Sequence, residues 1–155
     1  MPFAPLDDIP AVDAAFRAWG ADLEEVFRSA WNAVRAVLTG DDPTAETSEV
    51  PEMREAPGDT YATRTLGLRE RELDLLLLEF LQEQLYLKDA AALLCTVRAL
   101  EIEPTDGEWR LSATLTELPI VELGAYGVDV KAVTLDHLGV CRTASGWEAT
   151  VVLDL

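Results

Sequence analysis

The sequence contains few of the residues that enzymes use for nucleophilic or zinc chemistry. Its 155 residues include one histidine and two cysteines. A single histidine excludes zinc sites built from several histidines, and Cys95 and Cys141 lack the C-x-x-C spacing of metal and redox motifs. There is also no glycine-rich phosphate loop and no G-x-S-x-G motif. These absences argue against a zinc-dependent or nucleophile-based enzyme.

The cysteines and the histidine are not expected to form a catalytic pair. His137 and Cys141 fall four residues apart in one predicted strand, which places them about 13 Å apart. Both Cys95 and Cys141 lie in apolar, strand-like stretches, so we expect reduced core residues. Structural disulfides are rare in the cytoplasm, and we therefore expect a cytoplasmic protein.

Long hydrophobic runs and targeting signals are also missing. No stretch approaches the ~18 consecutive apolar residues of a membrane-spanning helix. The N-terminal residues MPFAPLDDIP have neither the basic nor the apolar region of a secretory signal. With 49% hydrophobic residues, residues 1–155 can bury the core of a single domain.

Positive charge is scarce. There are 12 basic residues against 29 acidic ones, for a formal net charge of −17, and the only lysines are Lys88 and Lys131. Such a surface repels phosphate backbones, so direct nucleic-acid binding is not expected. It suits a basic protein partner or a bound cation, although the charge could serve solubility alone.

The N-terminal half predicts a strand, a helix, a loop, a strand and a second helix. Residues 1–13 look irregular, and residues 14–19 form a strand that ends at Gly20. Apolar residues at helical spacing indicate a helix over residues 23–38, with Asp22 and Glu25 as a capping box and Gly40 as the stop.

Residues 40–59 are acidic and rich in proline, which indicates an exposed loop. A strand over residues 60–66 and a leucine-rich helix over residues 70–87 follow. The wide apolar stripe of this second helix predicts that it is more deeply buried than the first.

The C-terminal half predicts strands. Residues 94–103 and 109–118 form a hairpin around a turn at 104–107, and residues 128–141 and 147–155 flank a turn at 144–146. We therefore expect an α+β domain in two layers, with two helices packed on a mainly antiparallel or mixed sheet. No internal sequence repeat is evident.

Two segments resemble the archease family. The first joins VKAVT at residues 130–134 to the terminal GWEATVVLDL of residues 146–155; the second is DAAFRAWG at residues 13–20, followed by LEEVF at residues 23–27. The resemblance implies a strand-helix-strand-strand module elaborated by another. It also implies an accessory protein, not itself an enzyme, that promotes guanylylation and multiple turnover of an RtcB-type RNA ligase in tRNA splicing and RNA repair.

The resemblance further implies a divalent cation, calcium or magnesium, held by acidic side chains. Asp13 and Asp154 match the family's metal-site acids, and Asp8 follows once the alignment is shifted; Asp7 and Asp136 are weaker candidates. Lys131 matches the lysine of the family's KAVT strand and is expected to contact the ligase.

Two departures leave alternatives open. Pro10 stands where the family has a histidine, and Leu135-Asp136 replace a tyrosine and a histidine. A divergent archease-fold protein without a functional metal site, acting as a protein-binding or chaperone-like module, is therefore the second reading. A metal-dependent enzyme that works without a ligase, for example a hydrolase, is the third; it needs several acids in one closed pocket.

Overall fold

The computed structural model describes residues 3–5, 14–39, 61–119 and 130–154 of the chain. Their elements follow the chain as β1 (Phe3–Pro5), β2 (Ala14–Gly20), α1 (Leu23–Thr39), β3 (Thr63–Glu70), α2 (Leu73–Ala91), β4 (Thr96–Thr105), β5 (Glu108–Thr116), β6 (Ala132–Thr143) and β7 (Gly146–Asp154). No described helix is long and apolar enough to cross a membrane.

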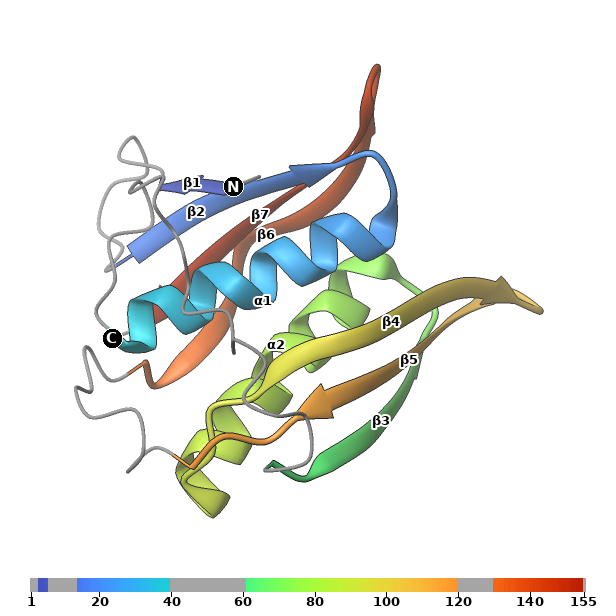
Figure 1. The fold of residues 1–155 in the computed structure, drawn as a ribbon. Coiled ribbons are helices and arrows are strands. Elements are labelled where there is room, and N and C mark those ends of the chain that lie inside the picture. The colour runs from blue at the N-terminus through green and yellow to red at the C-terminus, as the bar shows by residue number, and fades with distance from the viewer. Residues whose placement is uncertain (1–2, 6–13, 40–60, 120–129, 155) are drawn as a thin grey trace.

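The strands divide between two antiparallel sheets (Figure 1). One sheet has the order β1-β2-β7-β6 and the other the order β3-β5-β4. Helix α1 packs mainly on β2 and also contacts β4, while α2 packs on β6 and β3, so each helix touches both sheets. The predicted α+β class is confirmed, and the strands make two sheets where one was expected.

The fold repeats one topology. The first module consists of β2, α1, β6 and β7, and the inserted module consists of β3, α2, β4 and β5. In each module the last strand lies between the other two, because β7 pairs with β2 and β6 while β5 pairs with β3 and β4. The structure therefore contains a duplication that the residue identities do not reveal, and it confirms the modular architecture implied by the resemblance.

Helix α1 begins with the predicted capping box. The Asp22 Oδ1 atom accepts a hydrogen bond from the Glu25 backbone N–H at 2.8 Å. The Glu25 Oε1 atom accepts one from the Ala21 N–H at 2.7 Å, one residue before the usual position. These bonds satisfy amide groups that have no partner within the helix. The predicted stop, Gly40, lies outside the described residues.

The prediction that the second helix is more deeply buried is wrong. Helix α1 buries Trp31 completely, whereas Tyr86 on α2 is 61% exposed. The buried residues of α1 also occupy more of its length than those of α2. The physical reason is that α1 lies against the four-stranded sheet and the edge of the other, while one side of α2 faces solvent.

The two modules share one core, with Trp31 at its centre. The rings of Trp31 and Phe80 lie 4.8 Å apart, which joins α1 to α2. The Trp31 indole N–H donates to the Cys95 carbonyl oxygen at 2.9 Å, and the backbone carbonyl oxygen of Trp31 accepts a hydrogen bond from Gln84 Nε2 at 3.2 Å. The buried indole is thus hydrogen-bonded, as a buried polar group requires.

Element boundaries differ from the sequence predictions in the N-terminal half. Phe3–Pro5 forms a short strand where an irregular lead-in was expected. The third strand and second helix each begin about three residues later than predicted and end later, at Glu70 and Ala91. The predicted loop at residues 40–59 lies outside the described residues.

The C-terminal hairpins are confirmed. Asp106 and Gly107 form a two-residue turn with φ values of 47° and 81°, the positive angles of a type I′ hairpin. Cys95 is buried as expected, but Cys141 is exposed. The pairing of β6 with β7 shifts register between Thr134 and Gly139, so the alternation used to relate His137 to Cys141 does not hold there.

Candidate functional site at one end of the four-stranded sheet

Three strands of the four-stranded sheet start or end at the same side of the molecule, close to the C-terminus in Figure 1. Strand β7 ends at Asp154, which pairs with Ala132 at the start of β6. The preceding residue, Leu153, pairs with Ala14 at the start of β2. The sheet therefore brings the end of the chain beside a segment near its beginning.

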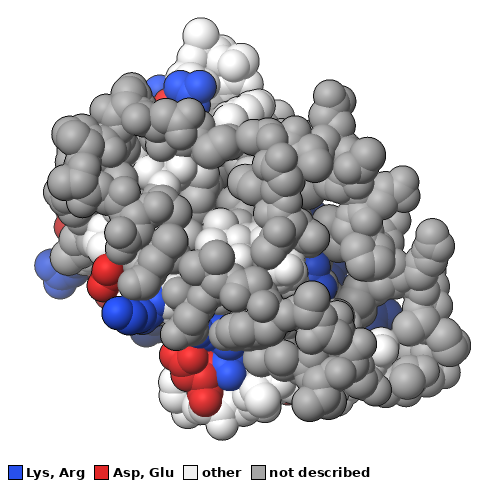
Figure 2. All heavy atoms as spheres, turned by 90° about the vertical axis from the view of Figure 1, so that its left-hand side faces the viewer, with Lys and Arg blue, Asp and Glu red and all other residues white. Residues whose placement is uncertain are grey.

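Asp154 and Lys131 meet at this sheet end. The Lys131 backbone N–H donates a hydrogen bond to the Asp154 carbonyl oxygen at 2.8 Å. Both residues are exposed, so a carboxylate and an ammonium group are available to solvent on adjoining backbone positions. Figure 2 faces this side of the molecule and shows described basic and acidic side chains close together on the surface.

The second lysine of the chain reaches the same sheet end from α2. The Lys88 side chain is 1% exposed, and its Nζ lies 2.9 Å from Asp89 Oδ1. It also donates to the Val130 carbonyl oxygen at 3.3 Å, one residue before Lys131. Sequence reasoning missed this role, although the spacing of Lys88 from Leu81 and Leu85 on the apolar stripe could have indicated it.

Side chains also hold the start of β6 in place. Gln82 Nε2 donates to the Val133 carbonyl oxygen at 3.4 Å, and Thr134 Oγ1 donates to the Val152 carbonyl oxygen at 3.4 Å. Together with Lys88, Gln82 attaches α2 to the outer edge of β6. The backbone that carries Lys131 is therefore supported from both the helix and β7.

Of the predicted acidic ligands, the structure places the side chain of Asp154 alone. Asp13, Asp8 and Asp7 lie outside the described residues, and for Asp136 the backbone of β6 is described but not the side chain. Within the described ranges, no group of three or more His, Cys, Asp or Glu side chains could hold a metal ion. The carboxylate of Asp154 suits a hard cation, which needs further oxygen ligands.

Two titratable groups elsewhere have shifted pKa values. Burial, with a further contribution from Glu117, raises the pKa of the Cys95 thiol to about 11, so it stays protonated and is a poor nucleophile at neutral pH. Burial and the neighbouring Glu70 carboxylate raise the pKa of Glu79 to about 7. Neither group belongs to the sheet end that carries Asp154.

The fold and this sheet end define a class of protein: an α+β domain of two interlocked β-α-β-β modules in which strand β7 ends at an exposed aspartate. The sequence pattern of the Archease protein family (MTH1598/TM1083) matches residues 6–155. Protein archease of Methanosarcina acetivorans is 32% identical over 145 residues, which cover 92% of this chain and 90% of that protein. The chain belongs to the archease family.

Solved structures agree with this assignment. The solution structure of Methanobacterium thermoautotrophicum protein 1598 has a TM-score of 0.73 and 29% sequence identity, and the match covers 99% of both chains. The crystal structure of a Thermotoga maritima archease, described as a possible chaperone, has a TM-score of 0.53, 16% identity, and coverage of 97% and 98%. The latter likeness concerns the fold alone.

Proposed function

We propose that this chain is a cytoplasmic accessory factor, without catalytic activity of its own, for an RtcB-type RNA ligase. In this role it promotes guanylylation and multiple turnover of the ligase in tRNA splicing and RNA repair. A calcium or magnesium ion would be held by Asp13, Asp154 and Asp8, with Asp7 and Asp136 as weaker candidates. Lys131 would contact the ligase.

The observation that carries the proposal is the junction of Lys131 with Asp154. The family resemblance singled out both residues, and their backbones are joined by a hydrogen bond at an exposed sheet end. A carboxylate and an ammonium group in this position can present a cation and a contact point to one partner surface.

The duplicated topology supports the inclusion of Asp13. Ala14 pairs with Leu153 in the first module, as Arg64 pairs with Leu115 in the inserted module. By this correspondence Asp13 and Asp154 are the counterparts of Thr63 and Thr116, and these two threonines pair with each other across β3 and β5. Two acids at counterpart positions would supply carboxylate oxygens from neighbouring strands.

The test is a reconstituted ligation assay with the cognate ligase and the full-length chain. Asp13→Ala and Asp154→Asn should each lower multiple-turnover ligation by tenfold or more, an effect typical of a lost metal ligand. Asp106→Asn is the matched control, because Asn-Gly suits the same type I′ turn and the turn lies in the inserted module. Unchanged ligation with both site variants would exclude the assigned cation site.

A divergent, metal-independent module that binds a protein partner is the alternative. The observation that favours it is the ammonium group of Lys131, whose backbone is hydrogen-bonded to Asp154, whereas the charge of Lys88 is paired with Asp89. Positive groups nearby weaken cation binding. Calorimetry that detects no calcium or magnesium binding, together with intact ligase association, would select this alternative.

A further inference from the structure

The two modules differ at one edge of their sheets. In the four-stranded sheet, β1 covers the edge of β2, with Phe3 opposite Ala18 and Pro5 opposite Phe16. The corresponding strand of the inserted module, β3, pairs only with β5 among the described residues. Figure 1 shows β3 at the periphery of its sheet. An edge strand of eight residues offers unpaired backbone groups to an incoming strand.

Side-chain burial follows this difference. On β2, Phe16 and Ala18 are almost completely buried, and the ring of Phe3 packs edge-to-face on Phe16 at 6.4 Å. Their counterparts on β3, Leu66 and Leu68, are only partly buried. An apolar side chain in the position of Phe3 would cover the leucines, since burial of apolar surface stabilises such a contact.

The charges along β3 specify the kind of strand that would fit. Arg69 lies directly opposite Arg110 on β5, and both are exposed. Like charges in this arrangement destabilise a sheet. Glu103 is opposite Arg110 on its other side, whereas no described ion pair involves Arg69. An acidic residue beside Arg69 would therefore be favoured.

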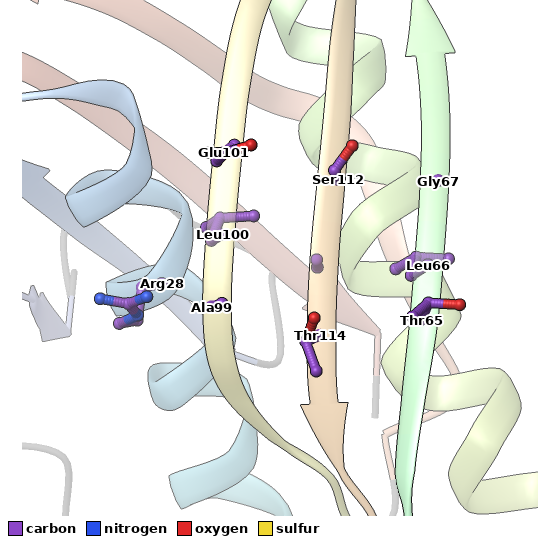
Figure 3. A pocket seen from close by; sticks show the side chains of 10 residues that line it. Arg28, Thr65, Leu66, Gly67, Ala99, Leu100, Glu101, Ser112 and Thr114 are labelled. Carbon is purple, nitrogen blue, oxygen red and sulfur yellow. The ribbon is translucent and has the colours of Figure 1, made fainter.

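The outer face of the same sheet leaves room beside β3. Figure 3 shows Thr65 and Gly67 of β3 next to Thr114 and Ser112 of β5; the threonines and the serine have small side chains, and the glycine has none. These residues line an open hollow of about 670 Å³, and Gly67 also borders a second hollow of about 380 Å³ that includes Arg69 and Arg110. A Cβ atom added at Gly67 would meet no described atom within 4 Å, so this face of β3 is open at that position.

We propose that the outer edge of β3 docks an extended segment of a partner protein that carries one acidic and two apolar residues. This segment adds to the sheet as an antiparallel strand, in the way β1 adds to β2. In the register of β1, apolar residues of the added strand would lie opposite Leu68 and Leu66. Any residue could lie opposite Gly67, and the charge of Arg69 favours an acid opposite it. Read from its N-terminal end, the recognised segment therefore has the pattern acid, apolar, any residue, apolar. This edge is separate from the proposed cation site and does not depend on it.

A second copy of the chain fits this edge less well. Within β3 the residue before Leu66 is Thr65, so its own leucines are not preceded by an acid. The only acid in the strand, Glu70, is followed by Arg71. A phosphate backbone has no N–H and C=O groups to continue the sheet and no apolar groups for the leucines. A protein segment is thus the occupant that matches the edge backbone of β3, its partly buried leucines and the charge of Arg69.

The test uses the full-length chain and a fluorescein-labelled peptide, Ser-Glu-Val-Thr-Val-Ser, followed by fluorescence anisotropy. Arg69→Glu should weaken binding about two- to fivefold, the range of one exposed ion pair, and a peptide with Lys in place of Glu should restore it. Arg98→Glu, an exposed arginine on β4, is the matched charge control and should leave affinity unchanged.

Backbone pairing is tested separately. Methylation of a single peptide nitrogen should abolish binding of the peptide when it falls on every second residue and should have little effect on the residues between. The reason is that alternate N–H groups of an antiparallel strand point toward β3. Loss at no position, or the same loss at every position, would overturn strand addition. Absence of peptide binding at millimolar concentration would overturn the site itself. Sedimentation that shows a dimer broken by Arg69→Glu would assign the edge to a second copy instead.

Discussion

The first and inserted modules have the same order of elements but differ in what surrounds their sheets. The first module has the extra strand β1 on one edge and its strand β7 ends at Asp154. In the inserted module, β3 pairs only with β5 among the described residues, and β5 ends at Thr116. Both proposed binding features therefore fall where the modules differ. A duplicated fold can thus keep its packing while its edges and strand ends take different roles.

The modules also hold each other in the same way. Glu24, in the first turn of α1, accepts a hydrogen bond from the Ile102 N–H on the edge of β4 at 2.9 Å. Asp74, in the first turn of α2, accepts one from the Val140 N–H on the edge of β6 at 2.8 Å. Each helix thus covers an edge strand of the other module, which protects that edge from pairing with another chain.

The largest expected effect concerns the core that the modules share. Trp31→Ala removes a completely buried ring that contacts Phe80 and a hydrogen bond to the Cys95 carbonyl oxygen. We expect a loss of about 3–5 kcal/mol in the free energy of unfolding. Urea denaturation followed by circular dichroism should still show a single transition, because neither module retains a complete core alone.

Trp19→Ala is the control for that substitution, since Trp19 is 40% exposed. Its effect should stay below about 1 kcal/mol. Two separate transitions in Trp31→Ala, one for each module, would show instead that the duplicated units fold independently.

A smaller effect should distinguish corresponding turn positions. Gly146 begins β7 with φ of 153°, and a Cβ atom there would overlap the carbonyl oxygen of Gly20. Its counterpart in the inserted module is Glu108, at the start of β5. Gly146→Ala should cost more than about 2 kcal/mol, and Glu108→Ala less than about 1 kcal/mol. Thermal denaturation measures both, and equal losses would contradict the close approach of Gly20.

The smallest effect is a pH dependence confined to the inserted module. The pKa of Glu79 is raised to about 7 by burial and by Glu70, so the folded protein binds a proton more tightly than the unfolded chain. The stabilising contribution is present at low pH and is lost as pH rises from about 4.5 through about 7. We expect less than about 1 kcal/mol, given the screening of a partly exposed group.

Urea denaturation at several pH values measures this contribution. Glu79→Gln should flatten the fall in stability over that pH range, and Glu83→Gln on the same helix is the charge-matched control. If the two variants showed the same pH profile, the carboxyl pair would not be the source of the dependence.

Features set by local residue patterns could be predicted well. Helix α1 and its cap follow from apolar spacing and from Asp22 with Glu25, whose hydrogen bonds span only a few residues. The hairpin at Asp106-Gly107 follows from turn chemistry that requires positive φ at both positions. Such interactions form between neighbours in the chain, so their signals are complete in the sequence.

Features that depend on distant segments could not be predicted. Phe3–Pro5 becomes a strand because β2 offers it an edge, and the short segment itself has no periodic pattern. The spacing of Lys88 from Leu85 indicates that its side chain is buried, but not that it contacts the Val130 carbonyl oxygen, because that contact joins residues 42 positions apart. The register shift in β6 likewise arises from its pairing with β7 and not from residues 135–138 alone.

The α+β class, the main helices and hairpins, and the family resemblance carried by Lys131 and Asp154 follow from local residue patterns. Two features depend on long-range packing: the division of the strands into two sheets with a duplicated topology, and the position of β3 as an edge strand among the described residues. The two groups of features differ because the interactions behind them act over different distances along the chain. Periodicity and turn chemistry act over a few residues, whereas sheet partners, helix burial and edge exposure depend on which distant segments pack together.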